Sequence, residues 1–95
     1  MRYEIYLAPE AVGDLRRLPV HVRAEVTVAI EKHLRHSPTA TSKSRIKKLK
    51  RVDRPKYRLR GDEVRVFYDV GEGAVEVVAI VPKSQAADWL ERVGG

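Results

Sequence analysis

The chain has 95 residues, of which 43% are hydrophobic and 34% charged, with no cysteine and a formal net charge of +6. This composition is typical of a small globular protein and excludes disulfide bonds and cysteine-bound metal. No apolar run approaches the roughly 18 residues of a membrane span, and the N-terminal stretch MRYEIYLAPEAV lacks the apolar core of a signal peptide. We therefore expect a cytoplasmic protein with one domain over residues 1–95 and no membrane partner.

The positive charge is concentrated in one segment. Residues 43–60, KSRIKKLKRVDRPKYRLR, contain ten lysines or arginines and one aspartate, a net charge of +9. The rest of the chain carries 9 basic and 12 acidic side chains, a net charge of −3. A basic segment in an otherwise acidic chain is typical of a surface that binds a polyanion, although a solvated charged loop gives the same pattern.

The N-terminal segment predicts a strand followed by a helix. Residues 3–7, YEIYL, alternate in hydropathy and favour a strand. The helix begins at Pro9, a residue favoured in the first turn of helices. Its apolar residues Val12, Leu15 and Leu18 lie three positions apart on one face, and the next proline ends it.

A second helix is predicted over residues 20–36. The following stretch SPTATS ends it, because a residue before proline avoids the helical region. The two helices together predict a helical hairpin. The apolar stripe of the second helix recurs every four positions as Val22, Val26, Ile30 and Leu34. No histidine has a second ligand at metal spacing, so we expect no metal at His21, His33 or His36.

The stretch KYRLRGDEVRVFYDV, residues 56–70, alternates in hydropathy on both sides of a Gly-Asp pair. It predicts a β-hairpin with Gly61-Asp62 as a two-residue turn, so that Arg58 lies directly opposite Arg65. Opposed like charges destabilise a sheet unless an anion lies between them, so we expect this face to bind one. The predicted apolar face holds Tyr57, Leu59, Val64, Val66 and Tyr68, and the predicted basic face holds Lys56, Arg58, Arg60, Glu63, Arg65 and Phe67.

The last strand is predicted over residues 75–81, VEVVAIV, and is apolar on both faces, as in a strand covered on both sides. A turn at Glu72-Gly73 would place Val78 and Ile80 beside Phe67 and Arg65. Residues 84–93, SQAADWLERV, predict a short C-terminal helix with Ser84 as its N-cap and with Trp89, Leu90 and Val93 as its apolar stripe. The predicted fold is therefore α+β with the order β-α-α-β-β-β-α. It has an antiparallel sheet, a helical hairpin on one face and a short C-terminal helix.

Phosphate is the anion that best explains three clustered arginines, because guanidinium groups fork onto phosphate oxygens and stabilise charge on a transferring phosphoryl group. The carboxylates are scattered, so cleavage of a nucleic acid would use the 2′-hydroxyl of RNA as nucleophile, without metal. Phe67 has two interpretations, as a platform for an unpaired base or as packing under the last helix.

The chain also resembles the RelE/ParE superfamily of toxins from toxin–antitoxin modules, over nearly all of its 95 residues. The similar segments are YEIYLAPEAVGDLRRLP, IKKLKR, YRLRGDEVRVFYDV and VEVVAIVPKS, of which the third is the most specific. The resemblance implies a compact fold like that of microbial ribonucleases. In the RelE branch, which we favour, it also implies cleavage of messenger RNA in the ribosomal decoding site without metal or another cofactor.

The resemblance also implies roles for individual residues. A basic pair, an arginine in the next strand and a basic residue after the last strand match the catalytic positions of RelE enzymes. Two further positions depart from the pattern, because Ser84 and Leu90 replace an arginine and a tyrosine, so no general base or acid is assigned. The implied catalytic residues are Arg58, Arg60, Arg65 and Lys83.

The same resemblance implies partners. They are the ribosome and messenger RNA, an acidic RelB-like antitoxin, and operator DNA bound only through the antitoxin complex. Two alternatives remain open: a ParE-like inhibitor that binds DNA gyrase, favoured by the two departures, and a catalytically degenerate RNA-binding relative. The residues expected to contact RNA or the ribosome are Lys43, Arg45, Lys47, Lys48, Lys50, Arg51, Lys56 and Phe67.

Overall fold

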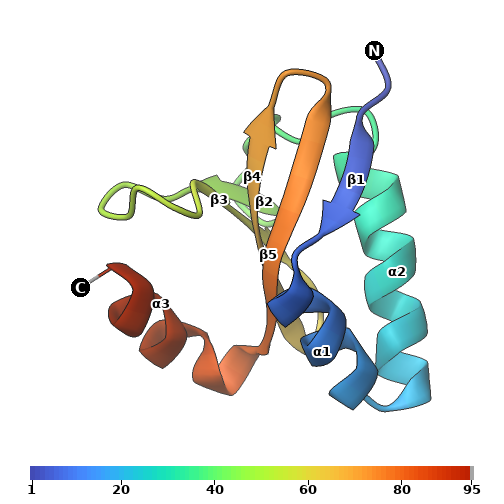
Figure 1. The fold of residues 1–95 in the computed structure, drawn as a ribbon, viewed down its shortest axis with the longest axis vertical. Helices are drawn as coiled ribbons and strands as arrows, with labels where there is room; N and C mark the ends of the chain where they lie inside the picture. Colours follow the sequence, from blue (N-terminus) through green and yellow to red (C-terminus); the bar gives the residue numbers. More distant parts are fainter. Residues whose placement is uncertain (95) are drawn as a thin grey trace.

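The computed structural model describes residues 1–94 as a five-stranded sheet with helices on both faces (Figure 1). The α+β class and the helical hairpin are confirmed. In chain order the elements are β1 (Glu4–Leu7), α1 (Pro9–Arg17), α2 (Val20–Leu34), β2 (Ile46–Lys48), β3 (Tyr57–Arg60), β4 (Val64–Gly71), β5 (Ala74–Pro82), a single 3₁₀ turn η1 (Lys83–Gln85) and α3 (Ala86–Gly94).

The strand order across the sheet is β1-β5-β4-β3-β2, and this order corrects the sequence prediction in two respects. First, β1 pairs with β5 in parallel, so the sheet is mixed rather than antiparallel. The connection from β1 to β5 runs through α1, α2 and strands β2 to β4, which gives the chain ample length for a parallel pairing. Second, β2 is an additional edge strand of three residues, formed inside the basic segment and antiparallel to β3.

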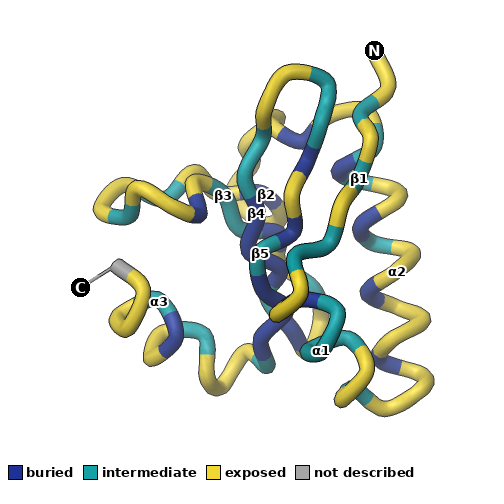
Figure 2. Tube along the Cα trace, in the orientation of Figure 1, coloured by how far each residue is buried: buried dark blue, intermediate teal, exposed yellow. Residues whose placement is uncertain are grey.

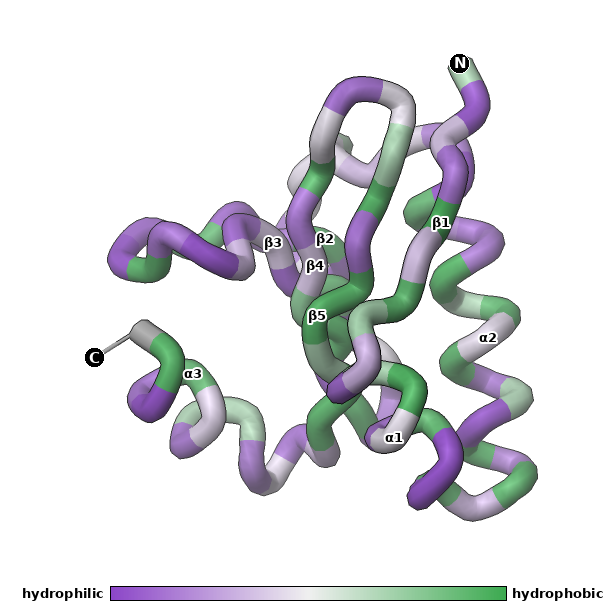
Figure 3. The backbone as a smooth tube through the Cα atoms, viewed as in Figure 1, coloured by the Kyte–Doolittle hydropathy of each residue, from purple (hydrophilic) through white to green (hydrophobic). Residues whose placement is uncertain are grey.

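The larger core lies between the sheet and helices α1 and α2. Figure 2 shows buried residues recurring along α2, and Figure 3 shows the matching alternation of hydrophobic and hydrophilic residues. The predicted stripe is confirmed, because Val22, Val26, Ile30 and Leu34 are all buried. On the sheet side, the buried Tyr68 stacks on Tyr57 with ring centroids 5.5 Å apart. Both tyrosines therefore pack in or against the core, as their alternation predicts.

The β3–β4 hairpin keeps the predicted faces in a different register. Arg60, not Arg58, lies opposite Arg65, and Leu59 lies opposite Val66. The Gly61 N–H donates to the Val64 carbonyl over 3.0 Å, so Asp62-Glu63 is the turn pair rather than Gly61-Asp62. The pairing shifts by two residues, so the side chains within β3 and β4 stay on their predicted faces, while Glu63 moves into the turn.

The β4–β5 hairpin turns at Glu72-Gly73 as predicted, with Gly73 at φ +69°, a conformation that favours glycine. Farther along, a β-bulge between Phe67 and Tyr68 shifts the register, so Phe67 lies opposite Ala79. The predicted placement of Ile80 beside Arg65 is therefore wrong. Val81 lies opposite Arg65 instead, and Ile80 turns into the larger core.

A smaller core lies on the opposite face of the sheet, under α3. Phe67 and Trp89 are buried there and stack with ring centroids 4.6 Å apart. The Trp89 indole N–H also donates to the Glu10 carboxylate over 3.1 Å, which attaches α3 to α1. The predicted stripe of α3 holds for Trp89 and for Leu90, which packs against this core, but not for Val93, whose exposed fraction is 47%.

Candidate anion-binding site

The basic face of the sheet, on the same side as α3, is built from rows of residues that pair across strands. In one row Lys47 of β2 lies opposite Arg58 of β3, and Arg58 lies opposite Phe67 of β4. In the next row Arg60 lies opposite Arg65. Residues directly opposite each other share a face, so the pairing gathers cations from three strands on one surface.

Four cations meet at one end of this face. A hollow of about 360 Å³ is lined by Arg45, Arg60, Arg65 and Lys83, together with Ser44, Gly61 and Asp62. The β3–β4 turn supplies Gly61 and Asp62, and η1 supplies Lys83, whose backbone N–H donates to the Glu63 carbonyl of the same turn over 3.0 Å. We call this hollow the cation hollow. Three of the four residues expected to be catalytic meet in it, while Arg58 lies one row away.

The arginines on this face repel one another. Burial lowers the pKa of Arg65, and the charges of Arg60 and Arg58 lower it further. Burial also lowers the pKa of Arg58, with a second contribution from Arg60. The Arg58 Nε is buried without a hydrogen-bond partner. Among residues 1–94, no carboxylate forms an ion pair with any of these three arginines.

Arg65 is held in place by hydrogen bonds to the β3–β4 turn. Its Nη1 donates to the Gly61 carbonyl over 2.9 Å and to the Val64 carbonyl over 3.0 Å. A Cβ at Gly61 would lie 3.2 Å from the same Val64 oxygen, a closer approach than most side chains tolerate. The glycine therefore allows the tight turn, and the turn carbonyls orient the guanidinium.

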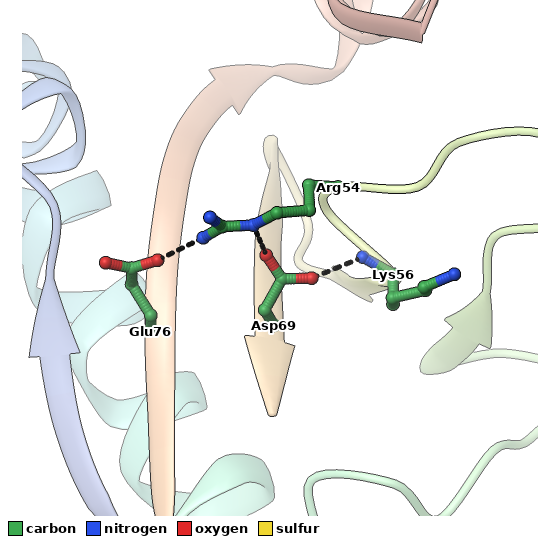
Figure 4. A network of polar contacts seen from close by, with 4 residues as sticks. All are labelled: Arg54, Lys56, Asp69 and Glu76. Carbon is green, nitrogen blue, oxygen red and sulfur yellow. Dashed lines mark hydrogen bonds and ion pairs between the residues drawn. The ribbon is translucent and has the colours of Figure 1, made fainter. Parts of the chain in front are cut away.

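A second pair of like charges lies at the other end of the same hairpins. Asp69 of β4 lies directly opposite Glu76 of β5, and Arg54 lies between their carboxylates (Figure 4). The Arg54 Nε donates to Asp69 Oδ2 over 2.9 Å, and its Nη2 donates to Glu76 Oε1 over 2.6 Å. The acidic pair thus has a counter-ion from the chain itself, whereas the basic pair of Arg60 and Arg65 has none among the described residues.

The residues expected to contact RNA divide between several surfaces. Lys47, Lys50 and Arg51 surround a second hollow of about 320 Å³, floored in part by Leu90 of α3. Lys48 is the neighbour of Lys47 in β2 and points to the opposite face of the sheet. Lys43 and Lys56 are exposed.

The expected contact between Phe67 and RNA does not fit the structure. The Phe67 ring is completely buried and stacked on Trp89, so no base can reach it. Of the two interpretations of Phe67, packing under the last helix is the one observed.

Sequence reasoning missed the groups that hold these surfaces together. The contacts of Arg54 with Asp69 and Glu76, and of Trp89 with Glu10, join residues far apart in the chain. Asp69 is the one residue of these contacts that the sequence marks as unusual, since it is the only acidic residue in the strand VRVFYDVG.

Within the described chain, no cluster of three metal-ligating side chains occurs and no helix is long and apolar enough to cross a membrane.

Comparisons with known proteins bear on the fold. No protein-family model and no curated protein sequence matches the chain. Several solved structures match it, and three of them, each at a probability of 1.00, are toxin–antitoxin complexes. The toxin–antitoxin complex RelBE2 from Mycobacterium tuberculosis has a TM-score of 0.72 and 20% identity, covering 87% of this chain and 100% of its own.

The other two are RelB–RelE complexes from archaea. The complex from Pyrococcus horikoshii has a TM-score of 0.71 and 22% identity, covering 90% of this chain and 99% of its own. The antitoxin–toxin complex from Methanococcus jannaschii has a TM-score of 0.67 and 24% identity, covering 88% of this chain and 96% of its own. At these identities the likeness concerns the fold, and the chain has the fold of RelE toxins.

Proposed function

We propose that the chain is the toxin of a toxin–antitoxin module and that it cleaves messenger RNA on the ribosome without a metal ion. The observation that carries the proposal is the Arg60–Arg65 pair at the cation hollow. Two opposed cations with no internal counter-ion are stabilised when an external anion lies between them. The RelE fold and the two neighbouring complexes described as RelB–RelE support a nucleic-acid phosphate as that anion.

The proposed reaction uses the substrate's own 2′-hydroxyl as nucleophile. Its oxygen attacks the adjacent phosphorus as a base removes the proton, a 2′,3′-cyclic phosphate forms, and the bond to the 5′-oxygen breaks. Arg60 and Arg65 stabilise the negative charge that builds on the phosphoryl oxygens. The ammonium group of Lys83, which lines the same hollow, is the proposed donor of a proton to the departing 5′-oxygen.

A second candidate function is inhibition of DNA gyrase by binding alone. The specific observation in its favour is Leu90, whose apolar side chain packs against the Phe67–Trp89 core where the RelE pattern has a tyrosine. Ser84, in η1, likewise replaces an arginine. A toxin that acts by binding needs neither residue. Arg60, Arg65 and Lys83 around one hollow favour RNA cleavage.

One experiment separates the two functions. The chain is induced in growing cells, the 5′ ends of transcripts are mapped against ribosome-covered codons, and gyrase-linked DNA breaks are counted in the same cultures. RNA cleavage predicts new 5′ ends within translated codons, and these ends should disappear in Arg65→Gln. Arg16→Gln, on the exposed end of α1, makes the same charge change away from the hollow and should keep full activity. DNA breaks without new RNA ends would replace the first function with the second.

We also propose an acidic antitoxin as partner. Lys47, Arg58 and Arg60 of the basic segment lie on the same face of the sheet as the cation hollow, and a flexible acidic chain that folds onto this face would neutralise the charge. Co-expression with the adjacent reading frame should yield a stable complex without activity. If that frame encodes no small acidic protein and the chain alone is harmless to cells, the toxin proposal fails.

A further inference from the structure

The loop between β2 and β3, residues 49–56, carries much of the positive charge and extends on the side of the molecule where α3 lies (Figure 1). We call it the basic loop. Its two ends are joined by a hydrogen bond of 2.7 Å from the Leu49 N–H to the Lys56 carbonyl. Figure 3 shows that it is mainly hydrophilic, and the side chains that it buries lie near its two ends, at Leu49 and Pro55.

Three consecutive residues attach one end of this loop to the sheet. The Arg54 guanidinium binds Asp69 and Glu76, the ring of Pro55 is completely buried, and the Lys56 N–H donates to Asp69 Oδ1 over 2.7 Å (Figure 4). Asp69 therefore uses one oxygen for a loop side chain and the other for a loop backbone amide. Its side chain is only 18% exposed, whereas that of Arg54 is 70% exposed, so Asp69 is the buried member of the anchor.

We infer that Asp69, with Arg54, is a positioning residue for RNA binding: it fixes the basic loop so that Lys50 and Arg51 face α3 across the second hollow. The inference rests on the proposed function of the basic face. Arg54, although it belongs to the basic segment, has its guanidinium bound to two carboxylates and serves to anchor the loop. The cations that remain for phosphate lie beyond this anchor, around the hollow with Lys47.

Simple electrostatics and the positioning role predict opposite changes in RNA affinity when Asp69 is replaced. Removing a carboxylate beside a basic surface raises its positive charge and should strengthen binding to a polyanion. If Asp69 positions the loop, its loss should weaken binding, because the cations are no longer held in one arrangement. Glu72, exposed in the β4–β5 turn with no hydrogen bond or ion pair among the described residues, offers the matched control for charge.

The experiment compares Asp69→Asn, Asp69→Ala and Glu72→Gln with the full-length wild-type chain. The probe is a short single-stranded RNA with 2′-O-methyl groups, so that the chain can bind it but cannot cleave it. Each protein is titrated with this RNA at several salt concentrations. We expect Asp69→Asn to weaken binding about threefold and Asp69→Ala about tenfold. The salt slope should fall by about 0.7 for each phosphate that the variant leaves unbound. Glu72→Gln should bind as tightly as wild type or more tightly.

Hydrogen exchange measures the anchor independently of RNA. The Lys56 and Leu49 amides should exchange faster in Asp69→Asn and faster still in Asp69→Ala, while the amides of α2 remain protected. If Asp69→Ala does not fold, Arg54→Gln removes the contact from the loop side and leaves β4 intact. Faster exchange of the Lys56 and Leu49 amides in Arg54→Gln would then support the anchor.

Unchanged exchange at both amides, or RNA binding by the Asp69 variants as tight as that of Glu72→Gln, would overturn the inference. A folded wild-type chain that binds no RNA at any salt concentration would instead overturn the proposed function, while the exchange rates still decide whether Asp69 anchors the loop.

Discussion

Replacing either member of the Arg60–Arg65 pair by glutamine should change stability in opposite directions. Arg60 is exposed and donates no hydrogen bond from its side chain among the described residues, yet it faces Arg65 and lowers the pKa of both Arg65 and Arg58. Its removal relieves repulsion and breaks no hydrogen bond. Opposed like charges cost ~0.2–1 kcal/mol, and solvent screening of an exposed side chain favours a value of about 0.5 kcal/mol.

Arg65 differs because its Nη1 holds the turn through the Gly61 and Val64 carbonyls. Losing two such bonds costs about 1–3 kcal/mol, since the turn lies near solvent and the Val64 oxygen keeps its bond from the Gly61 N–H. Relief of repulsion offsets about 0.5 kcal/mol of this. Arg65→Gln should therefore destabilise the chain by about 1.5 kcal/mol, and Arg60→Gln should stabilise it slightly.

Thermal unfolding, followed through the fluorescence of the single tryptophan, Trp89, measures both effects. For a domain of this size, 1 kcal/mol corresponds to roughly 4–8 °C, so the melting temperature should rise by about 2–4 °C in Arg60→Gln and fall by about 6–12 °C in Arg65→Gln. Both variants should lose RNA cleavage. A less stable Arg60→Gln or a more stable Arg65→Gln would show that repulsion between the two arginines and the turn hydrogen bonds of Arg65 do not set the stability of this hairpin.

Two further predictions concern groups away from the basic face. Tyr68→Phe should lower the free energy of unfolding, measured by urea titration, by about 1–3 kcal/mol, because the buried hydroxyl donates a 2.6 Å hydrogen bond to the Pro38 carbonyl. In the same measurement Tyr57→Phe should change it by less than about 0.5 kcal/mol. Burial, and then Tyr57, raises the pKa of Tyr68, so wild-type stability should fall as the pH rises above about 10, and a Tyr68→Phe curve with the same slope would contradict this. Burial, followed by the charges of Arg45 and Lys32, lowers the pKa of His33, so folding disfavours its protonation. Stability should fall as the pH drops below about 6.5, and His33→Gln should flatten that slope; an unchanged slope would assign it to other groups.

The faces of the β3–β4 hairpin were predictable from sequence and its register was not. Alternation places Leu59 and Val66 on one side and Arg60 and Arg65 on the other in any register shifted by two residues. The Gly-Asp pair suggested the turn position, but Gly61 is needed for its close approach to Val64 rather than for a positive φ. The predicted opposition of two arginines was therefore right in kind and wrong in its partner, since Arg60 takes the place of Arg58.

Other errors arise where the sequence carries no contrast. The strand over residues 75–81 is apolar on both faces, so nothing in its pattern marks the β-bulge that turns Ile80 into the larger core. The edge strand β2 has only three residues, too few for alternation to be visible within a run of lysines. Phe67 on a basic face is ambiguous until Trp89, which is distant in the chain, is placed against it.

The sheet separates two cores of unequal size. The larger one, against α1 and α2, includes Tyr68 and most of the buried side chains, whereas the smaller one under α3 consists of Phe67, Ala79, Val81 and Trp89. The cation hollow and the basic loop lie on the side of the smaller core. Substitutions on that side therefore disturb only the smaller core and leave most of the buried contacts unchanged. Because α1 and α2 pack against the other face, substitutions in η1 and α3 leave the larger core in place, and the helical hairpin continues to hold the sheet.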